Sequence, residues 1–343
     1  MNIPITDRRG VRKRESGGGV WALPASWLYG LGAGTMKALY DSGMLPARRV
    51  PLPVVSIGAL SVGGSGKTPF VLWLARRLRE EDVPVAILSR GYGGNGGATP
   101  RVVDPTHPDA ARDGDEPALM ARTLPDVPVI VSPDRARGAA LADGRGARLL
   151  LLDDGFQHRK LARDLDVVLW EAAAAASRGR LLPAGCLREP LSALHRADLV
   201  VLMDRGQGPP PAPPIDVEVV MNAKLVPVAR QRLLQGTRVH ALSGIGDPES
   251  FERGLETLGL VVTGATRYAD HHAWRASEIR ETLDRANGEE ADVIAVTAKD
   301  WVRWPRGSGD LPIPAVFDLA AEVEAGDALV GRVAGMVRGG SNR

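Results

Sequence analysis

The sequence predicts an α/β fold with a mostly parallel sheet and helices on both faces, followed by a smaller C-terminal α/β domain. Two observations support this prediction. Apolar runs typical of buried strands alternate with helical patterns along most of the chain. A glycine-rich turn also separates the first strand of this alternation from the first helix. A chain of 343 residues, of which 44% are hydrophobic, is long enough to build two cores.

The expected elements follow one another in a regular order. In the first half, strands are expected at 54–58, 83–89, 127–131, 149–152, 166–170 and 198–203. Helices are expected between them at 68–81, 115–122 and 134–143. In the second half, strands are expected at 239–243, 260–266 and 293–297, with helices near 248–258, 276–286 and 325–337.

Shifts in composition divide this order into regions. The proline-rich stretch from Gly206 to Pro214 is stiff and extended, so the first domain is expected to end there. A β-ribbon of 215–220 and 225–230 then leads to the second unit. The expected regions are a basic disordered tail (1–19), an N-terminal membrane-surface helix (20–46), the main core (47–205), the linker with its ribbon (206–232) and the C-terminal domain (233–343).

The glycine-rich turn consists of Ser61, Val62, Gly63, Gly64, Ser65, Gly66, Lys67 and Thr68. Glycines let the backbone turn its N–H groups inward, and the following helix N-terminus adds partial positive charge. Lys67 can reach the β- and γ-phosphates of a nucleotide, and the Thr68 hydroxyl can ligate Mg²⁺. The strict pattern requires glycine at Ser61, so the match is one residue short and a structural turn is the alternative. The turn therefore predicts a P-loop NTPase-like core that binds a triphosphate.

A second polar segment follows the apolar run 149–152. Asp153 and Asp154 stand at the end of this expected strand. Ligands of open α/β sheets bind beyond the carboxyl ends of the strands, so two carboxylates there are placed to hold Mg²⁺ directly or through water. A helix cap is the alternative, and it is weaker for two aspartates in succession than for one. Gln157 and His158 are ligands, nucleotide contacts or packing residues, and the pattern does not separate these roles.

Further charged and polar residues are expected at the same edge of the sheet. Arg90 and Tyr92 lie in a glycine-rich loop after a strand, which suits an anionic substrate group but also an ordinary loop. Arg135 either clamps a phosphate or is a solvated helix residue. Arg188 and Glu189 form a charged pair just before another helix.

Two segments are candidates for acid–base chemistry. Asp115 begins an expected helix, where a plain N-cap is the alternative. Asp270, His271 and His272 group an acid with two imidazoles, but no cysteine or third histidine completes the spacing of a zinc site. A general base, or a histidine that orients one, is therefore the better hypothesis for this segment.

Charge and cysteine content exclude several classes of protein. Lys and Arg total 43 against 41 Asp and Glu, so no global field for nucleic acid is expected. The single cysteine, Cys186, excludes a disulfide within the chain and fits a reducing compartment. No stretch reaches the roughly 18 uninterrupted apolar residues that a spanning helix needs. No protein partner is predicted.

The N-terminal segment combines cations with aromatic and aliphatic residues. A basic cluster between Arg8 and Arg14 precedes an apolar stretch that Pro24 interrupts, so an export signal is not expected. Such a segment can lie in a membrane interface, and a helix packed on the core is the alternative. The expected apolar surface consists of Trp21, Leu23, Trp27, Leu28 and Leu31.

Taken in order, these segments resemble the tetraacyldisaccharide 4′-kinase family, the lipid A kinases of Gram-negative bacteria. The glycine-rich turn is followed by Leu-Ser-Arg-Gly-Tyr-Gly-Gly, Gly-Asp-Glu-Pro and Asp-Asp-Gly-Phe-Gln-His, and then by Gly-Arg-Leu-Leu-Pro-Ala-Gly and Leu-Arg-Glu-Pro. Segments 23–30, 270–272 and 297–300 also fit. The resemblance covers about residues 20 to 335, and the ordered set is far more specific than any single motif.

The resemblance implies a membrane-associated kinase. Such an enzyme transfers the γ-phosphate of ATP, with Mg²⁺, to the 4′-hydroxyl of a tetraacylated glucosamine disaccharide 1-phosphate and forms lipid IVA. It is expected at the cytoplasmic face of the inner membrane as a peripheral protein. The implied fold is a P-loop core with a smaller C-terminal domain, joined by a two-stranded linker.

The same resemblance implies roles for individual residues. Asp115 and His271 match an Asp–His pair that activates the acceptor hydroxyl, and Lys67 acts on the transferred phosphoryl group. Asp153 and Asp154 match the metal-binding acids. Arg135, Arg188 and Glu189 match charged groups lining the site. Together with them, Arg90, Tyr92, Gln157 and His158 are expected to bind the substrate.

The chain departs from the family pattern at a few positions. Ala59 replaces the usual Asn, and Ser61 and Ser65 stand where Thr is common. Cys186 stands where Pro is common, and Ala298 replaces the Glu of a Thr-Glu-Lys-Asp segment. None of these changes removes a group that phosphate, metal or base chemistry needs, but the change at Ala59 puts one contact behind the P-loop in doubt.

Two other classes of function stay open at this stage. A nucleotide-driven switch at the membrane would read guanine with segment 297–300, would prefer GTP and would need neither Asp115 nor His271. A noncatalytic adaptor would bind nucleotide tightly without forming a product. The P-loop lysine and the paired aspartates argue against the adaptor, because decay usually removes such costly charges first.

Overall fold

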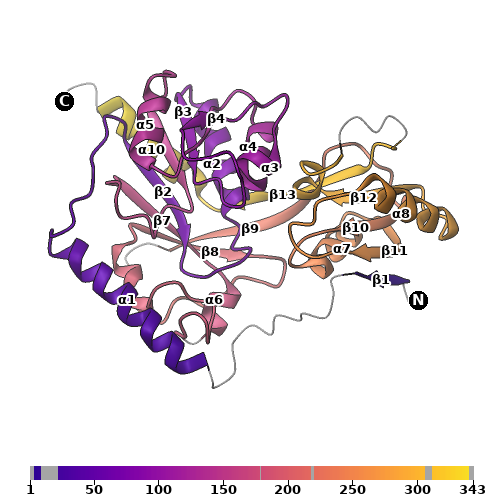
Figure 1. Cartoon of the computed structure of the whole chain (residues 1–343), viewed down its shortest axis with the longest axis horizontal. Helices are drawn as coiled ribbons and strands as arrows, with labels where there is room; N and C mark the ends of the chain where they lie inside the picture. The colour runs from indigo at the N-terminus through magenta and orange to yellow at the C-terminus, as the bar shows by residue number, and fades with distance from the viewer. Residues whose placement is uncertain (1–3, 9–21, 178, 218–219, 306–310, 340–343) are drawn as a thin grey trace.

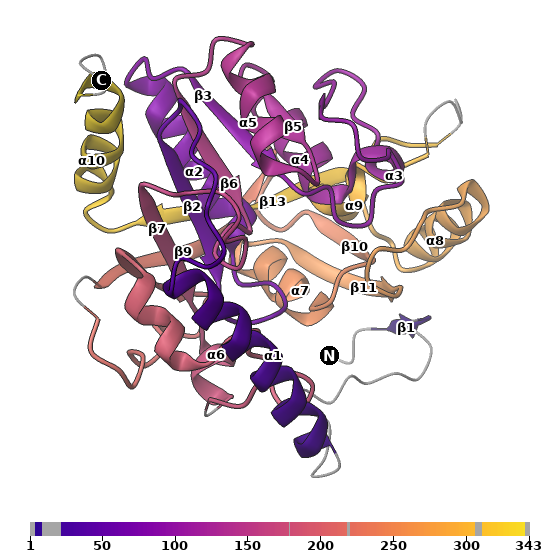
Figure 2. The same cartoon turned by 60° about the vertical axis from the view of Figure 1, so that its left-hand side comes forward.

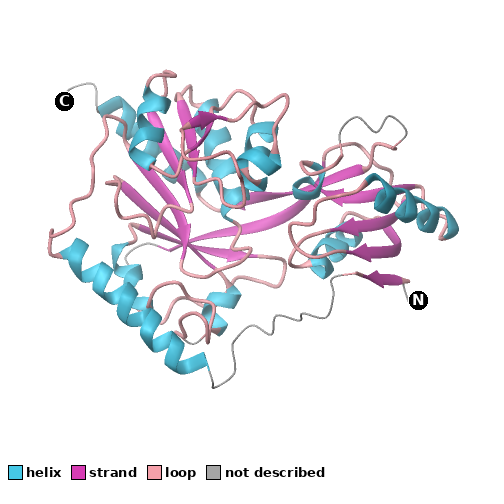
Figure 3. Cartoon of the chain, viewed as in Figure 1, coloured by secondary structure: helices cyan, strands magenta, loops and turns pink. Residues whose placement is uncertain are grey.

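One continuous thirteen-stranded sheet runs through the molecule, as the computed structural model in Figures 1 and 3 shows. The structure describes residues 4–8, 22–177, 179–217, 220–305 and 311–339. The strands are β1 (Ile5–Asp7), β2 (Val54–Ala59), β3 (Val85–Ser89), β4 (Arg101–Val102), β5 (Val129–Val131), β6 (Leu149–Asp153), β7 (Leu165–Trp170), β8 (Leu199–Asp204), β9 (Val220–Ala229), β10 (Arg238–Ser243), β11 (Val261–Arg267), β12 (Val293–Thr297) and β13 (Ala315–Val323). Their order across the sheet is β1-β11-β10-β12-β13-β9-β8-β7-β2-β6-β3-β5-β4.

The helices lie on both faces of this sheet (Figure 3). They are α1 (Leu23–Asp41), α2 (Lys67–Glu80), α3 (Ala110–Asp113), α4 (Asp115–Thr123), α5 (Arg135–Asp143), α6 (Ala172–Ala176), the 3₁₀ helix η2 (Leu191–Arg196), α7 (Pro248–Thr257), α8 (Ala276–Gly288), α9 (Ala298–Trp301) and α10 (Gly326–Gly339). The predicted α/β class is confirmed, and the predicted helices and strands begin and end within a few residues of the observed ones.

In the first lobe, β2 lies between β6 and β7, and all three strands are parallel. The run 149–152 is apolar at every position because both faces of the sheet are covered. Leu149 and Leu151 share a core with α2, whereas Leu150 and Leu152 pack with α5 on the opposite face. All four leucines are fully buried. This packing brings the carboxyl ends of β2, β3 and β6 to one edge of the sheet.

The second lobe repeats this arrangement on a smaller scale. Strands β10, β11 and β12 are parallel to one another. Helix α7 packs on one face through Leu255, and α8 packs on the other through Ile279. The two faces of the second lobe therefore have separate apolar cores, and the core beside α8 also includes Ala118 and Leu119 of α4 from the first lobe.

The predicted ribbon of 215–220 and 225–230 is wrong in its pairing. Strand β9 is a single strand that pairs parallel with β8 through its first half and antiparallel with β13 along residues 223–229. The partner strand β13 begins more than eighty residues later. It was missed because its alanine-rich sequence has weak β propensity, and the pairing depends on a distant segment.

The C-terminal helix α10 returns to the first lobe, although its residues lie in the range expected for the C-terminal domain. Leu329, Val330 and Val333 are buried in the same core as α2. Figure 2 shows α10 beside the first lobe. Arg77 on α2 also forms an ion pair of 2.6 Å with Asp327. The chain therefore crosses between the lobes twice, through β9 and through β13.

At the N-terminus, residues 4–8 were expected to be disordered, and this expectation is wrong for them. Strand β1 extends the far edge of the second lobe by pairing parallel with β11. The Arg8 guanidinium hydrogen-bonds the Tyr268 hydroxyl and forms an ion pair with Glu281. Residues 9–19 of the expected tail lie outside the described residues, as does Trp21.

Helix α1 lies along the first lobe near α6 (Figures 1 and 2). Pro24 occupies its first turn, where a proline costs no intrahelical hydrogen bond, so this residue starts the helix and does not break it. Within the described ranges, no helix has the length and hydropathy of a membrane span.

Candidate active site between the two lobes

The glycine-rich turn connects the end of β2 with the start of α2. Gly63 and Gly66 have φ angles of +112° and +79°, which only glycine adopts without strain. The Lys67 ammonium donates to Ser65 Oγ at 2.9 Å and lies 3.5 Å from Asp154 Oδ1. Lys67 and Thr68 form the first turn of α2, so the lysine and the positive end of the helix dipole meet at the same point.

Ser61, the residue that departs from the strict glycine pattern, has a structural role. Its buried hydroxyl donates to Glu171 Oε1 at 2.7 Å. The next backbone N–H, that of Val62, donates to the carbonyl of Cys186 at 2.8 Å. These bonds fasten the start of the turn to the segments that follow β7 and α6. The serine therefore anchors the start of the turn.

Asp153 and Asp154 face this turn from the end of β6. Asp153 Oδ2 accepts from Ser89 Oγ at 3.0 Å, but Oδ1 of each aspartate is buried without a hydrogen-bond partner. Burial, with the nearby charges of Glu116 and Asp154, raises the pKa of Asp153 to about 7. Burial also opposes ionisation of Asp154, but Lys67 and Arg188 outweigh it and lower the pKa of that carboxyl. Asp154 Oδ1 has the Lys67 ammonium at 3.5 Å, whereas Asp153 Oδ1 accepts no hydrogen bond, and a buried carboxylate oxygen of this kind is one that a cation satisfies.

The donor set here suits a cation that is shared with a ligand. No group of three or more His, Cys, Asp or Glu side chains that could hold a metal occurs within the described parts of the chain. Mg²⁺ usually binds through one or two carboxylates together with substrate phosphates and water. Asp153, Asp154 and the Thr68 hydroxyl at the start of α2 fit that pattern better than an all-protein cage.

Cationic and neutral donors surround the aspartates. Arg135 is 3% exposed and donates to the Ser132 carbonyl at 2.6 Å, while its Nε has no hydrogen-bond partner. Burial lowers the Arg135 pKa to about 10, against the opposing effect of Asp153, and the charge of Arg90 lowers it further. Burial of His158, together with the positive charge of Arg135, lowers the pKa of this imidazole to about 4, so it is neutral at pH 7.

Arg188 and Gln157 form a bridge behind the P-loop. Arg188 Nη1 donates to Asp154 Oδ2 at 2.6 Å and to Gln157 Oε1 at 3.4 Å. The Gln157 amide donates in turn to the Ala59 carbonyl at 3.1 Å. Glu189 faces away from this bridge, because its carboxylate pairs with Arg196 at 2.9 Å. Arg188 therefore belongs to the cluster around the aspartates, whereas Glu189 makes a neighbouring structural ion pair.

Asp115 and His271 meet across the two lobes. Asp115 Oδ2 lies 2.7 Å from His271 Nδ1, although the two residues are 156 positions apart. Asp115 begins α4, whereas His271 lies in the loop between β11 and α8. Burial opposes ionisation of Asp115, but the His271 hydrogen bond and Arg303 lower its pKa below the usual value. Asp115 is therefore ionised at neutral pH and accepts a hydrogen bond from the imidazole.

The pair opens into a pocket of about 720 Å³ between the lobes. Tyr92, from the loop after β3, lines it and is 81% exposed. Trp274 and Trp304 line it from the second lobe. Polar and aromatic groups together suit a sugar-sized ligand, because aromatic faces cover apolar ring surface while polar groups orient hydroxyls.

Arg303 is a residue of this site that the sequence reasoning missed. Its Nε lies 3.5 Å from Asp115 Oδ2, so it reaches the first lobe from the second. Its other nitrogens donate to the carbonyls of His272 and Gly244 at 3.0 Å each, and to Asp300 at 2.7 Å. The side chain is only 6% exposed. The available signal was the three-residue spacing of Asp300 and Arg303, which suits an ion pair between α9 and the turn that follows it.

The side chains of segment 297–300 make internal hydrogen bonds, which contradicts the alternative that this segment binds guanine. Asp300 is fully buried, and its carboxylate accepts from Thr297 Oγ1, the Gly244 N–H and Arg303. A carboxylate that reads guanine must be free to accept from the base, and this one has no free face. The segment instead fixes the loops that carry His271.

Comparisons with known proteins find similar sequences over most of the chain. Residues 19–333 match the family model described as tetraacyldisaccharide-1-P 4′-kinase. A tetraacyldisaccharide 4′-kinase of Anaeromyxobacter sp. (strain Fw109-5) is 41% identical over 327 residues, which cover 89% of this chain and 88% of the relative. The corresponding protein of Syntrophotalea carbinolica is 40% identical over 305 residues, 85% of this chain and 84% of the relative.

A solved structure is similar as well. The crystal structure of LpxK from Aquifex aeolicus in complex with ATP superposes with a TM-score of 0.75 at 31% identity. The match covers 93% of this chain and 99% of that one.

Proposed function

The chain belongs to the tetraacyldisaccharide-1-P 4′-kinase family, and on that premise we propose that it transfers the γ-phosphate of ATP to the 4′-hydroxyl of tetraacyldisaccharide 1-phosphate, which yields lipid IVA. The observation that carries the proposal is that two groups of residues lie close together: the P-loop with Asp153 and Asp154, and the Asp115–His271 pair. A P-loop with paired aspartates can hold ATP, and Glu116, next to Asp115, is close enough to Asp153 to raise its pKa. We therefore take the Asp115–His271 pair to lie beside the phosphate site, because the segment that ends β3 reaches both. Ser89 donates to Asp153, and a Cβ on Gly114, just before Asp115, would stand 2.7 Å from the Tyr92 carbonyl oxygen.

The phosphate site is proposed to act mainly through charge. Lys67 and the N-terminus of α2 would neutralise charge on the β- and γ-phosphates. Thr68, Asp153 and Asp154 would hold Mg²⁺, which when bound screens the negative charge of the transferred group. The raised pKa of Asp153 suits this role, because a cation that arrives there relieves an unfavourable buried charge.

The Asp115–His271 pair is proposed to activate the acceptor. A sugar hydroxyl is a poor nucleophile, and a positioned base that accepts its proton accelerates the transfer by roughly 10²–10⁴-fold. Ionised Asp115 holds the His271 Nδ1–H, which leaves the opposite imidazole nitrogen and the second carboxylate oxygen as the basic atoms of the pair. Arg303 keeps Asp115 ionised and fixes the loop that carries His271.

The charged cluster is proposed to bind the anionic sugar substrate. Arg90, Arg135 and neutral His158 together offer donors for a phosphate group. Arg188 and Gln157 orient Asp154, and Tyr92 covers the sugar in the pocket between the lobes. Glu189 supports this region through its pair with Arg196.

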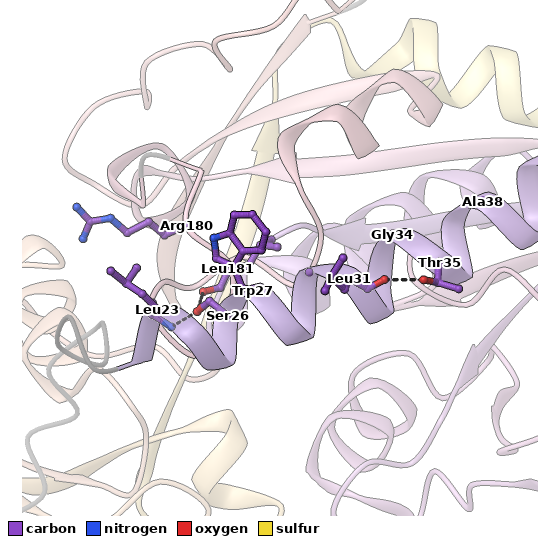
Figure 4. Close-up of a pocket in the computed structure, with 11 residues that line it drawn as sticks. Leu23, Ser26, Trp27, Leu31, Gly34, Thr35, Ala38, Arg180 and Leu181 are labelled. Carbon is purple, nitrogen blue, oxygen red and sulfur yellow. Dashed lines mark hydrogen bonds between the residues drawn. The ribbon is translucent and has the colours of Figure 1, made fainter.

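Helix α1 is proposed to lie in the interface of the inner membrane, on its cytoplasmic face. Leu23, Trp27, Leu28 and Leu31 are 44%, 75%, 72% and 60% exposed, which is unusual for large apolar side chains on one helix. Between α1 and Leu181 lies a mostly apolar pocket of about 660 Å³ (Figure 4). Such a pocket beside a membrane-facing helix suits an acyl chain of the lipid.

Hydrogen bonds hold α1 in place against the first lobe. Ser26 Oγ donates to the Leu181 carbonyl at 3.1 Å and accepts from the Ala184 N–H at 2.9 Å. Figure 4 shows Ser26 and Leu181 beside Leu23, Trp27 and Leu31 of the helix. The apolar surface is therefore presented by a fixed element of the fold.

The test is phosphate transfer from γ-labelled ATP to tetraacyldisaccharide 1-phosphate in detergent micelles, with and without Mg²⁺. We expect a bisphosphorylated lipid that depends on Mg²⁺ and is lost in Lys67→Ala. Arg79→Ala is the matched control, because this exposed cation lies in the last turn of α2, at the end opposite the P-loop. Folded protein that binds ATP but forms no lipid product would reject the proposed reaction.

A further inference from the structure

Arg205 lies over the P-loop, although nothing in the loop pattern points to it. This residue directly follows β8. A Cβ atom on Gly64 would stand 3.6 Å from Arg205 Nη2 and 3.7 Å from Nη1. The guanidinium therefore lies where a side chain on this exposed glycine would contact it. A bulkier residue at position 64 would press against it.

The guanidinium is held only loosely by its carboxylate neighbours. Glu171 Oε2 lies 3.9 Å from Nη1, and Asp247 Oδ2 lies 3.7 Å from Nη2. Both distances exceed that of a hydrogen bond. By contrast, Arg188 and Arg303, in the same site, donate hydrogen bonds as short as 2.6 and 2.7 Å. Arg205 thus keeps a planar fork of donors beside the loop, half-buried and without short bonds to these carboxylates.

The backbone that presents Arg205 is fixed. Asp204 Oδ1 accepts from the N–H groups of Gly206 and Gln207 at 2.8 and 3.0 Å, which closes a tight turn around Arg205. This turn stands at the carboxyl end of β8, at the edge of the sheet where ligands bind in open α/β folds. Only the side chain has to move for its donors to reach a ligand on the P-loop.

We propose that Arg205 binds the phosphate chain of the nucleotide on the P-loop, as a cation that reaches it from outside the glycine-rich motif. The inference rests on the proposed function, since it assumes that ATP occupies this loop. Phosphate oxygens accept the bidentate hydrogen bonds that a guanidinium offers. The carboxylates of Glu171 and Asp247 lie too far from Arg205 to accept such bonds in this structure. Glu171 and Asp247 then keep the free arginine close to its ligand.

A structural bridge is the competing role, because Glu171 belongs to the first lobe and Asp247 to the second. The two roles differ in what Asp247→Asn does. Asparagine caps α7 as well as aspartate does, so the variant removes the charge and keeps the hydrogen bond to the Ser250 N–H. If Arg205 is a bridge between the lobes, this change weakens the bridge. If Arg205 binds phosphate, the change frees its guanidinium from Asp247 and leaves it available to the ligand.

The experiment measures binding of a non-hydrolysable ATP analogue and of adenosine by calorimetry, without lipid. We expect Arg205→Ala to weaken the analogue about 10- to 100-fold and to leave adenosine binding unchanged. Arg205→Lys should recover part of the loss. Asp247→Asn should bind the analogue as tightly as the parent protein or more tightly.

Two results would overturn the inference. One is unchanged analogue affinity in Arg205→Ala while the parent protein binds normally. The other is an equal loss of affinity in Asp247→Asn, which assigns Arg205 to the bridge. A parent protein that does not bind the analogue at all would instead reject the nucleotide site of the proposed function, and this inference with it. Thermal melting of each variant checks that the fold is retained.

Discussion

Two regions supply the chemistry of this site, and they are built in different ways. The P-loop and the Asp153–Asp154 segment are each continuous in sequence and follow neighbouring parallel strands of one lobe. The Asp115–His271 pair joins residues 156 positions apart from two lobes. A phosphate cradle needs only local backbone geometry and one helix N-terminus, whereas the pair needs the lobes to be held in register by β9 and β13.

The comparison teaches where each region is vulnerable. In the phosphate region, the charged groups bond one another across short loops, as Lys67 and Arg188 do with Asp154. In the acceptor region, Arg303 connects Asp115 with the carbonyls of the His271 loop. Damage to the first region should abolish nucleotide binding and transfer together, whereas damage to the second should affect transfer alone.

The largest effect is expected for Lys67→Ala. Loss of the ammonium leaves transition-state charge on the transferred group uncompensated, so kcat/KM should fall by at least about 10³-fold. Binding of the ATP analogue should weaken in the same variant. Calorimetry and the lipid-phosphorylation assay measure the two effects. Normal analogue affinity with lost transfer would show that the phosphate region is not the binding determinant we describe.

The next largest effect is expected for Asp115→Asn and His271→Ala. Each should lower kcat by roughly 10²–10⁴-fold, because the acceptor hydroxyl loses its base or the group that orients it. Affinity for the ATP analogue should stay within about twofold of the parent. His272→Ala is the matched control, since that imidazole stacks on Tyr268 and bonds Glu278. An equal loss of kcat in the control would break the distinction between the two histidines.

A smaller effect is expected for Arg303→Lys. Lysine keeps the charge near Asp115 but cannot make the forked bonds to His272, Gly244 and Asp300. We expect kcat to fall about tenfold with little change in KM for ATP. Arg230→Lys is the control, because Arg230 also connects the lobes but does so through Thr123 and Asp318. A similar loss of kcat in that control would assign the effect to lobe contact in general.

The smallest effect is a pH-dependent change in stability from Asp153→Asn. Burial raises the pKa of Asp153 from 3.8 to about 7. The protonated carboxyl therefore contributes fully to the free energy of unfolding below pH 4, and this contribution is lost as the pH rises through 7 and the buried carboxyl ionises. Asparagine carries no such cost. In metal-free protein with a chelator, Asn should therefore raise Tm by about 2–4 °C at pH 8.5 and by less at pH 5. A larger gain at pH 5 would contradict the buried position of this carboxyl.

Much of the fold and of the phosphate region was predictable from short stretches of sequence. Buried parallel strands read as continuous apolar runs because both faces of the sheet are covered, and 149–152 is the clearest case. The glycine-rich turn was recognisable because positive φ angles at Gly63 and Gly66 require glycine there. The Asp115–His271 contact came only from resemblance to a family, since neither segment contains a signal for the other.

Local sequence was sufficient for the α/β class, the P-loop and the paired aspartates, because steric and hydrophobic rules act within a few residues. Long-range packing alone decided that β9 pairs with β13, that α10 returns to the first lobe, and that Arg205 lies over Gly64. Each of these contacts joins segments with no local preference for one another. They form because the continuous sheet and the cores on its two faces bring these segments together when apolar surface is buried and the backbone is paired.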